Sequence, residues 1–149
     1  MIKKEKNILT SINIESILSD EYSSISIQKK LSDLVEVIKK SDKNIFAVED
    51  EKGIFCGIIE LNDIKRLLFD NKGSGHTAIR QLMKKPRAII YVNESMTSVM
   101  EKMDIAQTWY LPVVTKDKKF VSFISKTKLF NRYREILGAE TDIYDNNQN

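Results

Sequence analysis

Apolar residues recur along the chain in a pattern that occurs twice. Many apolar positions in the first half have an apolar counterpart at a constant offset in the second, and the two halves align without a gap from Ile14 to Arg134. Ile14 thus corresponds to Ile79, and Ile59 corresponds to Ile124. Few paired residues are identical, but their apolar character is kept. An internal repeat of this kind predicts one supersecondary unit used twice. Because such a unit is too small to bury a core alone, we expect the two units to pack on each other, with a ligand groove between them.

The periodicity within each half predicts the same order of elements: a short helix, a strand, a longer helix, an antiparallel hairpin and a closing helix. In the first half these elements are expected at residues 14–18, 24–27, 31–38, 44–59 and 62–69. In the second half they are expected at residues 79–83, 88–92, 96–103, 109–124 and 127–137. The predicted fold class is therefore α+β, with two tandem β-α-β-β-α repeats related by pseudo-two-fold symmetry.

The pattern also divides the chain into five parts. Residues 1–11 form an N-terminal lead-in, residues 12–71 the first repeat, residues 72–76 a linker that contains glycine, and residues 77–138 the second repeat. Residues 139–149 form a polar tail, which we expect to be frayed.

Composition excludes several classes of function. The 24 basic and 21 acidic residues give a net charge of +3 and are interspersed, which argues against a nucleic-acid partner. Cys56 is the only cysteine, so the chain has no internal disulfide and suits a reducing compartment. No stretch approaches the roughly 18 consecutive apolar residues of a membrane span, and the N-terminus lacks the apolar core of a signal peptide. We expect that the chain itself does not cross a bilayer.

Residues that could perform catalysis are scarce. The single histidine, His76, lies in a Gly-Ser-Gly-His segment, and Cys56 lies in an apolar run; no neighbour in sequence would activate either side chain. Neither the spacing typical of metal ligands nor a glycine-rich phosphate loop is present. We therefore expect no catalytic residue, no metal site and no enzymatic activity.

The β-α-β-β-α order, taken twice in tandem, resembles the cystathionine-β-synthase (CBS) domain pair, also called a Bateman module. Residues 44–53, followed by Gly57-Ile58-Ile59, are similar to the first repeat of that family, and Leu111-Pro112-Val113-Val114 is similar to the second. The resemblance covers about residues 12–138. It implies a regulatory module that requires no cofactor and that binds an adenine nucleotide or nucleoside (AMP, ADP, ATP or adenosine) between its repeats.

A narrower resemblance concerns the host protein. The segments 4–10, 63–69 and 125–134 are similar to the cytosolic CBS pair at the C-terminus of bacterial CLC-type chloride channel or antiporter proteins. This resemblance implies a homodimer on the cytoplasmic side of the inner membrane, with the membrane-embedded transporter portion of the same polypeptide as its partner. A CBS regulator from another host, either a stand-alone protein or a different transporter, is the alternative.

The nucleotide signature of the family is Gly, two apolar residues, Ser or Thr, two residues of any kind, and Asp. Its hydroxyl and a helix N-terminus hold phosphate, and its carboxylate binds the ribose hydroxyls. The first repeat keeps the carboxylate as Asp63 but has Glu60 at the hydroxyl position. The second repeat keeps the hydroxyl as Ser125 but has Lys128 at the carboxylate position. Each repeat thus carries half of the signature.

The family builds its clefts crosswise, so that the signature of one repeat faces the strands of the other. One cleft would combine Ser125 and Lys128 with Ser24, Ile25 and the Phe46 region. It offers a hydroxyl and a cation, which suit an anion or a phosphate, but it has no ribose clamp.

The other cleft would combine Glu60 and Asp63 with Ile89 and the Leu111 region, and would suit adenosine better than a charged nucleotide. Loss of one buried charge-assisted hydrogen bond costs about 1.5–3 kcal/mol, or roughly ten- to a hundredfold in affinity. Two half-sites therefore predict weak binding, altered specificity or no binding. A dimerisation scaffold with empty clefts is the alternative, and capping alone would favour Asp63 and Ser125 at helix N-termini.

Two further groups of apolar residues could serve a partner. The pair Trp109-Tyr110 could stack on a base, but we favour packing in a core or an interface. Met96, Met100 and Met103 are spaced along one helix face, where we expect core packing or pairing of modules into a dimer.

Overall fold

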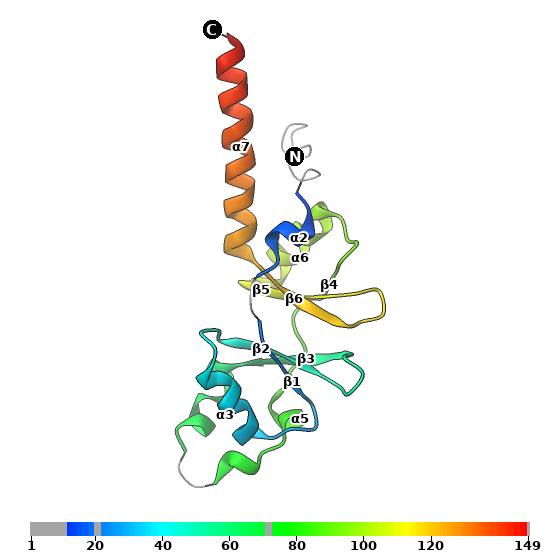
Figure 1. The fold of residues 1–149 in the computed structure, drawn as a ribbon, viewed down its shortest axis with the longest axis vertical. Coiled ribbons are helices and arrows are strands. Elements are labelled where there is room, and N and C mark those ends of the chain that lie inside the picture. The colour runs from blue at the N-terminus through cyan, green and yellow to red at the C-terminus, as the bar shows by residue number, and fades with distance from the viewer. Residues whose placement is uncertain (1–11, 20–21, 71–72, 149) are drawn as a thin grey trace.

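The two halves of the chain form two three-stranded sheets, stacked one above the other in the centre of the molecule (Figure 1). The computed structural model describes residues 12–19, 22–70 and 73–148. The first half contains the elements β1 (Ser24–Ser26), α3 (Leu31–Lys39), β2 (Ile45–Glu49), β3 (Phe55–Glu60) and α4 (Leu61–Leu68). The second half contains β4 (Ile90–Tyr91), α6 (Met96–Ala106), β5 (Tyr110–Val114), β6 (Phe120–Ser125) and α7 (Lys126–Gln148). Short helices α2 (Ile14–Ile17) and α5 (Ile79–Leu82) precede β1 and β4, and a 3-10 turn, η1 (Ser74–His76), precedes α5.

The duplication extends to the hydrogen-bond register of the sheets. In each half the first strand runs parallel to the second, and the second runs antiparallel to the third. Ile45 pairs with Glu60 in the first repeat, and their equivalents in the second repeat, Tyr110 and Ser125, also pair. An irregularity follows Val48 in one ladder and Val113 in the other. The predicted α+β fold with two equivalent β-α-β-β-α repeats is confirmed.

The short helices are exchanged between the repeats. Ile14 and Ile17 of α2 are buried in the core of the second repeat, together with Val99 and other residues of that repeat. Ile79 of α5 is fully buried in the core of the first repeat, together with Phe46. Each repeat therefore completes its core with the short helix that precedes the other repeat in the chain.

A third apolar cluster, which we call the seam, joins the two sheets. It contains Ile45, Ala47 and Ile58 from the first repeat and Phe123 from the second. The ring of Phe123 is fully buried, and its centroid lies 4.6 Å from that of Tyr22. The predicted packing of the two repeats on each other is thus confirmed, because neither sheet could bury this face alone.

Helix α7 is longer than expected. It continues to Gln148, past the predicted end at Leu137 and through the tail that we expected to be frayed, and its C-terminal part projects away from the sheets (Figure 1). The sequence from 126 to 148 contains no proline and a single glycine, Gly138, so nothing in it forces the helix to stop. Within the residues described, no helix combines the length and the apolar character needed to cross a membrane.

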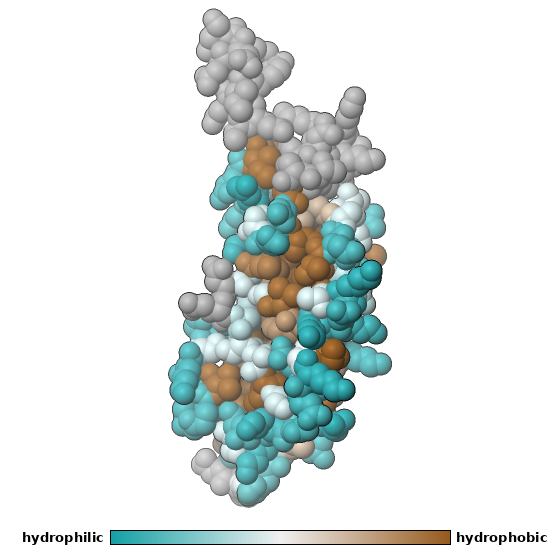
Figure 2. Space-filling view, turned by 45° about the vertical axis from the view of Figure 1, so that its right-hand side comes forward, coloured by the Kyte–Doolittle hydropathy of each residue, from teal (hydrophilic) through white to brown (hydrophobic). Residues whose placement is uncertain are grey.

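Apolar side chains also reach the surface. Figure 2 shows one face on which they form a band along the middle of the molecule, with polar side chains at its margins. Among the large apolar residues, Phe69 and Ile105 are each 82% exposed, and Trp109 is 65% exposed. The expectation for the methionines holds in part, because Met96 and Met103 are buried in the second core while Met100 is only partly buried.

Candidate ligand groove

Three cavities of about 330, 350 and 340 Å³ follow one another where the two repeats meet. Glu60 and Trp109 line the first two cavities, Thr127 lines the second and third, and Tyr110 lines all three. The cavities therefore form one continuous groove. We call its two ends cleft A, the cavity that contains Lys84, and cleft B, the cavity that contains Lys128.

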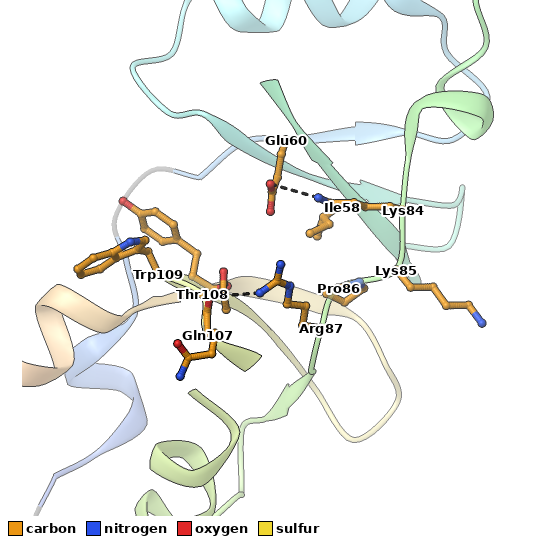
Figure 3. Close-up of a pocket in the computed structure, with 10 residues that line it drawn as sticks. Ile58, Glu60, Lys84, Lys85, Pro86, Arg87, Gln107, Thr108 and Trp109 are labelled. Carbon is orange, nitrogen blue, oxygen red and sulfur yellow. Dashed lines mark hydrogen bonds and ion pairs between the residues drawn. The ribbon is translucent and has the colours of Figure 1, made fainter. Parts of the chain in front are cut away.

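Cleft A is organised by a lysine that the sequence did not single out (Figure 3). The Lys84 ammonium lies 3.2 Å from Glu60 Oε2 and 2.6 Å from Asp63 Oδ2. Hydrogen bonding to Asp63 raises the pKa of Lys84, while partial burial opposes that rise and the contact with Glu60 adds to it. Lys84 therefore offsets the negative charge that we expected to repel a phosphate here, and it also engages the carboxylate expected to hold ribose.

The backbone places Lys84 by docking the segment after α5 on strand β3. The Ile58 N–H donates to the Lys84 carbonyl at 2.9 Å, and the Lys84 N–H donates to the Ile58 carbonyl at 2.8 Å. This approach requires glycine at position 57, since a Cβ there would lie 2.9 Å from the Lys84 carbonyl oxygen. At the equivalent position of the second repeat, Ser122 instead donates its hydroxyl to the Ser19 carbonyl at 2.7 Å.

Arg87 fixes the opposite wall of cleft A. Its guanidinium donates to the carbonyl oxygen of Ala106 at 2.8 Å and to that of Gln107 at 3.2 Å, at the end of α6. Figure 3 shows the contact with Gln107. Gln107 has a left-handed backbone, with φ of 50°, and ends the helix. Arg87 thus satisfies helix carbonyls that have no partner within the helix and positions the Thr108–Tyr110 segment in the groove.

Cleft B is lined by cations without a carboxylate among its described residues, whereas cleft A also contains Glu60. It lies at the N-terminus of α7, where the Ser125 hydroxyl accepts a hydrogen bond from the Lys128 N–H at 3.2 Å. Lys43 and Lys128 line it, and none of the described residues that line it is acidic. The Lys128 ammonium also donates to the Leu18 carbonyl at 2.6 Å. Positive side chains, hydroxyls and the positive end of a helix dipole together form a chemical environment that suits a phosphate.

Aromatic side chains line the groove beside these polar groups. The rings of Tyr22 and Tyr110 meet edge to face at 5.9 Å, and the Lys43 ammonium lies 5.1 Å from the centroid of Tyr22. Burial, followed by hydrogen bonding to Tyr110, raises the pKa of Tyr22, so its phenol stays protonated at neutral pH. Trp109 is exposed at the groove, with the Lys126 ammonium 5.5 Å from its centroid, so it is not packed in a core; packing in an interface, the other arrangement we favoured, stays a prediction. The exposed indole can contact a planar ligand.

Comparison with known proteins agrees with the fold. Residues 79–135 match the family model of the CBS domain. CbpB, solved in complex with c-di-AMP, has the same fold with a TM-score of 0.75 and 15% identity, over 95% of this chain and 97% of that chain. This chain has the fold of a CBS domain pair. Staphylococcus aureus OpuCA also matches the CBS pair, with a TM-score of 0.67 and 17% identity over 80% of this chain and 97% of that chain.

Curated relatives of the CBS pair include a longer protein. The chain is 23% identical over 136 residues to "Carnitine transport ATP-binding protein OpuCA" of Listeria monocytogenes. The match covers 91% of this chain and 33% of that protein, so the chain spans about a third of the length of the curated relative.

The structure of the CBS pair brings together some of the residues expected in the clefts. Glu60 and Asp63 share the Lys84 ammonium; Glu60 lines cleft A, whereas Asp63 is not among its described lining. Ser125 and Lys128 meet in cleft B, at the start of α7. Both pairs lie where a strand is followed directly by a helix, as their spacing in the sequence predicts.

None of the strand residues expected in the clefts lines the three cavities, although Ile45, next to Phe46, and Tyr110, next to Leu111, do. Ile25 and Phe46 are buried in the core of the first repeat, and Leu111 is buried in the core of the second. Ser24 is exposed on β1, and Ile89 lines a fourth cavity that borders cleft A. Their side chains face the cores or other surfaces, so segments that precede the strands line the groove instead.

Those segments supply the residues that sequence reasoning missed. Tyr22 and Lys43 lie just before β1 and β2 in cleft B, and their repeat equivalents, Arg87 and Thr108, lie in cleft A together with Lys84. The sequence marks these residues only by their equivalent positions in the two repeats. Lys43 and Thr108, for example, each lie two residues before the second strand of a repeat.

Proposed function

We propose that this CBS pair is a regulatory module of a larger transporter protein and that it binds an adenine nucleotide through its phosphate in cleft B. The observation that carries this proposal is a cavity that contains Lys43, Lys128 and the N-terminus of α7, with no acidic residue among its described lining. A phosphate there would meet two cations, Lys43 and Lys128, at the positive end of the α7 dipole.

The groove offers room for the rest of the nucleotide. Its middle cavity, of about 350 Å³, is lined by Trp109 and Tyr110, whose rings can contact a base. Cleft A is a poorer site for a nucleoside, because Lys84 already engages Asp63. The proposal is supported by the fold shared with CbpB, which was solved with c-di-AMP, a ligand built from two adenine nucleotides.

The relatives bear on the host protein. The match to a carnitine transport ATP-binding protein favours the ATP-binding subunit of a transporter as the host. A CLC-type channel or antiporter, expected from the closing helices, receives no support from this relative and is kept as the alternative host. In either host the nucleotide would act by binding two conformations of the module with unequal affinity.

Calorimetric titration with AMP, ADP, ATP, c-di-AMP and adenosine tests the ligand. We expect binding of at least one phosphate-bearing ligand, with adenosine at least about tenfold weaker because it lacks the charge-assisted contacts. The most discriminating variant is Thr127→Glu, which places a carboxylate in the first turn of α7. An acidic residue there stabilises a helix, so the fold is retained while phosphate is repelled.

The matched control is Thr127→Gln, which has similar size and no charge. We expect it to keep most of the affinity, whereas Thr127→Glu should abolish binding. No heat with any nucleotide, or equal affinity of the two variants, would count against a phosphate site in cleft B.

A dimerisation scaffold is the second candidate, and one observation favours it. Ile105 on α6 is 82% exposed and Phe130 on α7 is 37% exposed, while the equivalent residues of the first repeat are Lys40 and Lys65. The apolar character is thus confined to one repeat, which suits a homodimer through the face formed by α6 and α7. A dimer that persists at micromolar concentration, dissociates on Ile105→Lys and ignores every nucleotide would favour the scaffold.

A further inference from the structure

A fourth cavity, of about 310 Å³, borders cleft A, with which it shares Lys85 and Pro86. Phe55 at the start of β3, Val114 at the end of β5 and Ile89 just before β4 contribute its apolar walls. The groove, in contrast, is lined by Glu60 at the end of β3 and Tyr110 at the start of β5. The two sites therefore lie at opposite ends of the same strands.

The charged residues of this cavity are both cationic. Lys85 and Lys118 line it, and no acidic residue of the described chain does. Figure 3 shows Lys85 pointing away from the other labelled residues of cleft A. The Phe55 N–H donates to the Lys118 carbonyl at 2.8 Å, which holds the turn between β5 and β6 against β3. The backbone that carries the second cation is thus anchored to the wall of the cavity.

The internal repeat shows that the fold does not require this lining. In the first repeat, the equivalents of Ile89, Tyr91, Val114 and Lys118 are Ser24, Ser26, Glu49 and Gly53. These counterparts lie on the equivalent strands and in the equivalent hairpin turn of the first repeat. The first repeat therefore folds although its side chains there are polar, acidic or, at Gly53, missing. An apolar wall with basic residues is therefore a property of one repeat and not of the architecture.

We propose that this cavity is a second binding site, distinct from cleft B, for a small amphipathic anion: an apolar body that carries one carboxylate. Its volume falls at the lower end of the roughly 300–1,000 Å³ typical of ligand pockets. Removal of the apolar body from water supplies the affinity. Lys85 and Lys118, both exposed, supply selectivity for negative charge and add up to about fivefold each in affinity.

Cys56 provides a direct reporter, because it lines the cavity and is the only cysteine of the chain. The rate at which N-ethylmaleimide modifies Cys56, followed by mass spectrometry, measures occupancy. We expect octanoate at ten times its dissociation constant to slow the reaction about tenfold. Octylammonium, of the same length and opposite charge, should leave the rate unchanged, and so should AMP, which the groove binds.

The double variant Lys85→Gln with Lys118→Gln should weaken octanoate about tenfold, since each exposed ion pair contributes up to about fivefold. The matched control removes two lysines that do not line the cavity, Lys52→Gln with Lys116→Gln, and should retain full protection. The proposal is overturned if octanoate does not protect Cys56, if octylammonium protects it equally, or if both double variants behave alike. Protection by AMP equal to that by octanoate would overturn the separation of the two sites.

Discussion

Replacing Phe123 with alanine tests whether the two repeats share one seam. The ring is fully buried, its centroid lies 4.6 Å from that of Tyr22 and 5.2 Å from that of Phe120, and it packs in one cluster with Ile45 and Ile58. Phe→Ala substitutions in a core cost about 3–5 kcal/mol, out of the roughly 5–15 kcal/mol that stabilises a typical domain. Because the cluster belongs to both sheets, we expect both repeats to lose this stability together.

Urea denaturation with two probes measures the effect. Fluorescence of Trp109, the only tryptophan, reports on the second repeat, and far-ultraviolet circular dichroism reports on both. The two midpoints should coincide and should fall together in Phe123→Ala. The control is Phe69→Ala, where the ring is 82% exposed and the loss should stay within about 0.5 kcal/mol. A loss below about 1 kcal/mol for Phe123→Ala, or separate midpoints for the two probes, would refute a shared seam.

Three further predictions follow from individual contacts. Gly57→Ala should destabilise the fold by about 1–3 kcal/mol, because its Cβ would lie 2.9 Å from the Lys84 carbonyl; an unchanged melting temperature would contradict this. Burial raises the pKa of Glu94, but hydrogen bonds, foremost from Lys102, outweigh it and leave that pKa below its usual range. The stabilisation is therefore present above the ordinary pKa, about 4.3, and is lost as the pH falls through the depressed pKa. Glu94→Gln should cost about 1–2 kcal/mol at pH 7 and reduce the loss of stability on acidification, and an acid profile identical to that of the parent would count against it. Lys84→Gln should change stability by less than about 1 kcal/mol, since the Lys84 side chain is 45% exposed, yet should strengthen adenosine binding by freeing Asp63; titration calorimetry with no gain in affinity would exclude this role.

The repeat predicted the fold well because duplication preserves the apolar pattern. The two hairpins occupy equivalent positions of the two repeats, down to the irregularities after Val48 and Val113. The exchange of α2 and α5 could not be predicted in the same way. Ile14, Ile17 and Ile79 show by their spacing that one face of a short helix is buried, but that spacing does not show which core receives the face.

The candidate site was predictable only where its residues are close in sequence. Glu60 with Asp63, and Ser125 with Lys128, follow from short spacing at a junction between a strand and a helix. Phe46 is fully buried in a strand whose residues 45–48 are all buried, so no alternation marks which side chain faces a cleft.

Lys84 was missed for a related reason. Its position depends on the docking of the segment after α5 against β3, a contact between residues of different repeats. Only the requirement for glycine at position 57 points to that docking, and a glycine in a strand is compatible with several causes.

The central claim is that the groove between the repeats binds a phosphate-bearing nucleotide in cleft B. Two-dimensional amide NMR of the 17.2 kDa chain during titration with AMP and c-di-AMP tests it most directly. We predict saturable shifts at residues 125–128 of α7, at Lys43 and at Tyr110, with none at the exposed Phe69. Saturation by both ligands without any shift at residues 125–128, or shifts confined to the cavity around Cys56, would contradict the account.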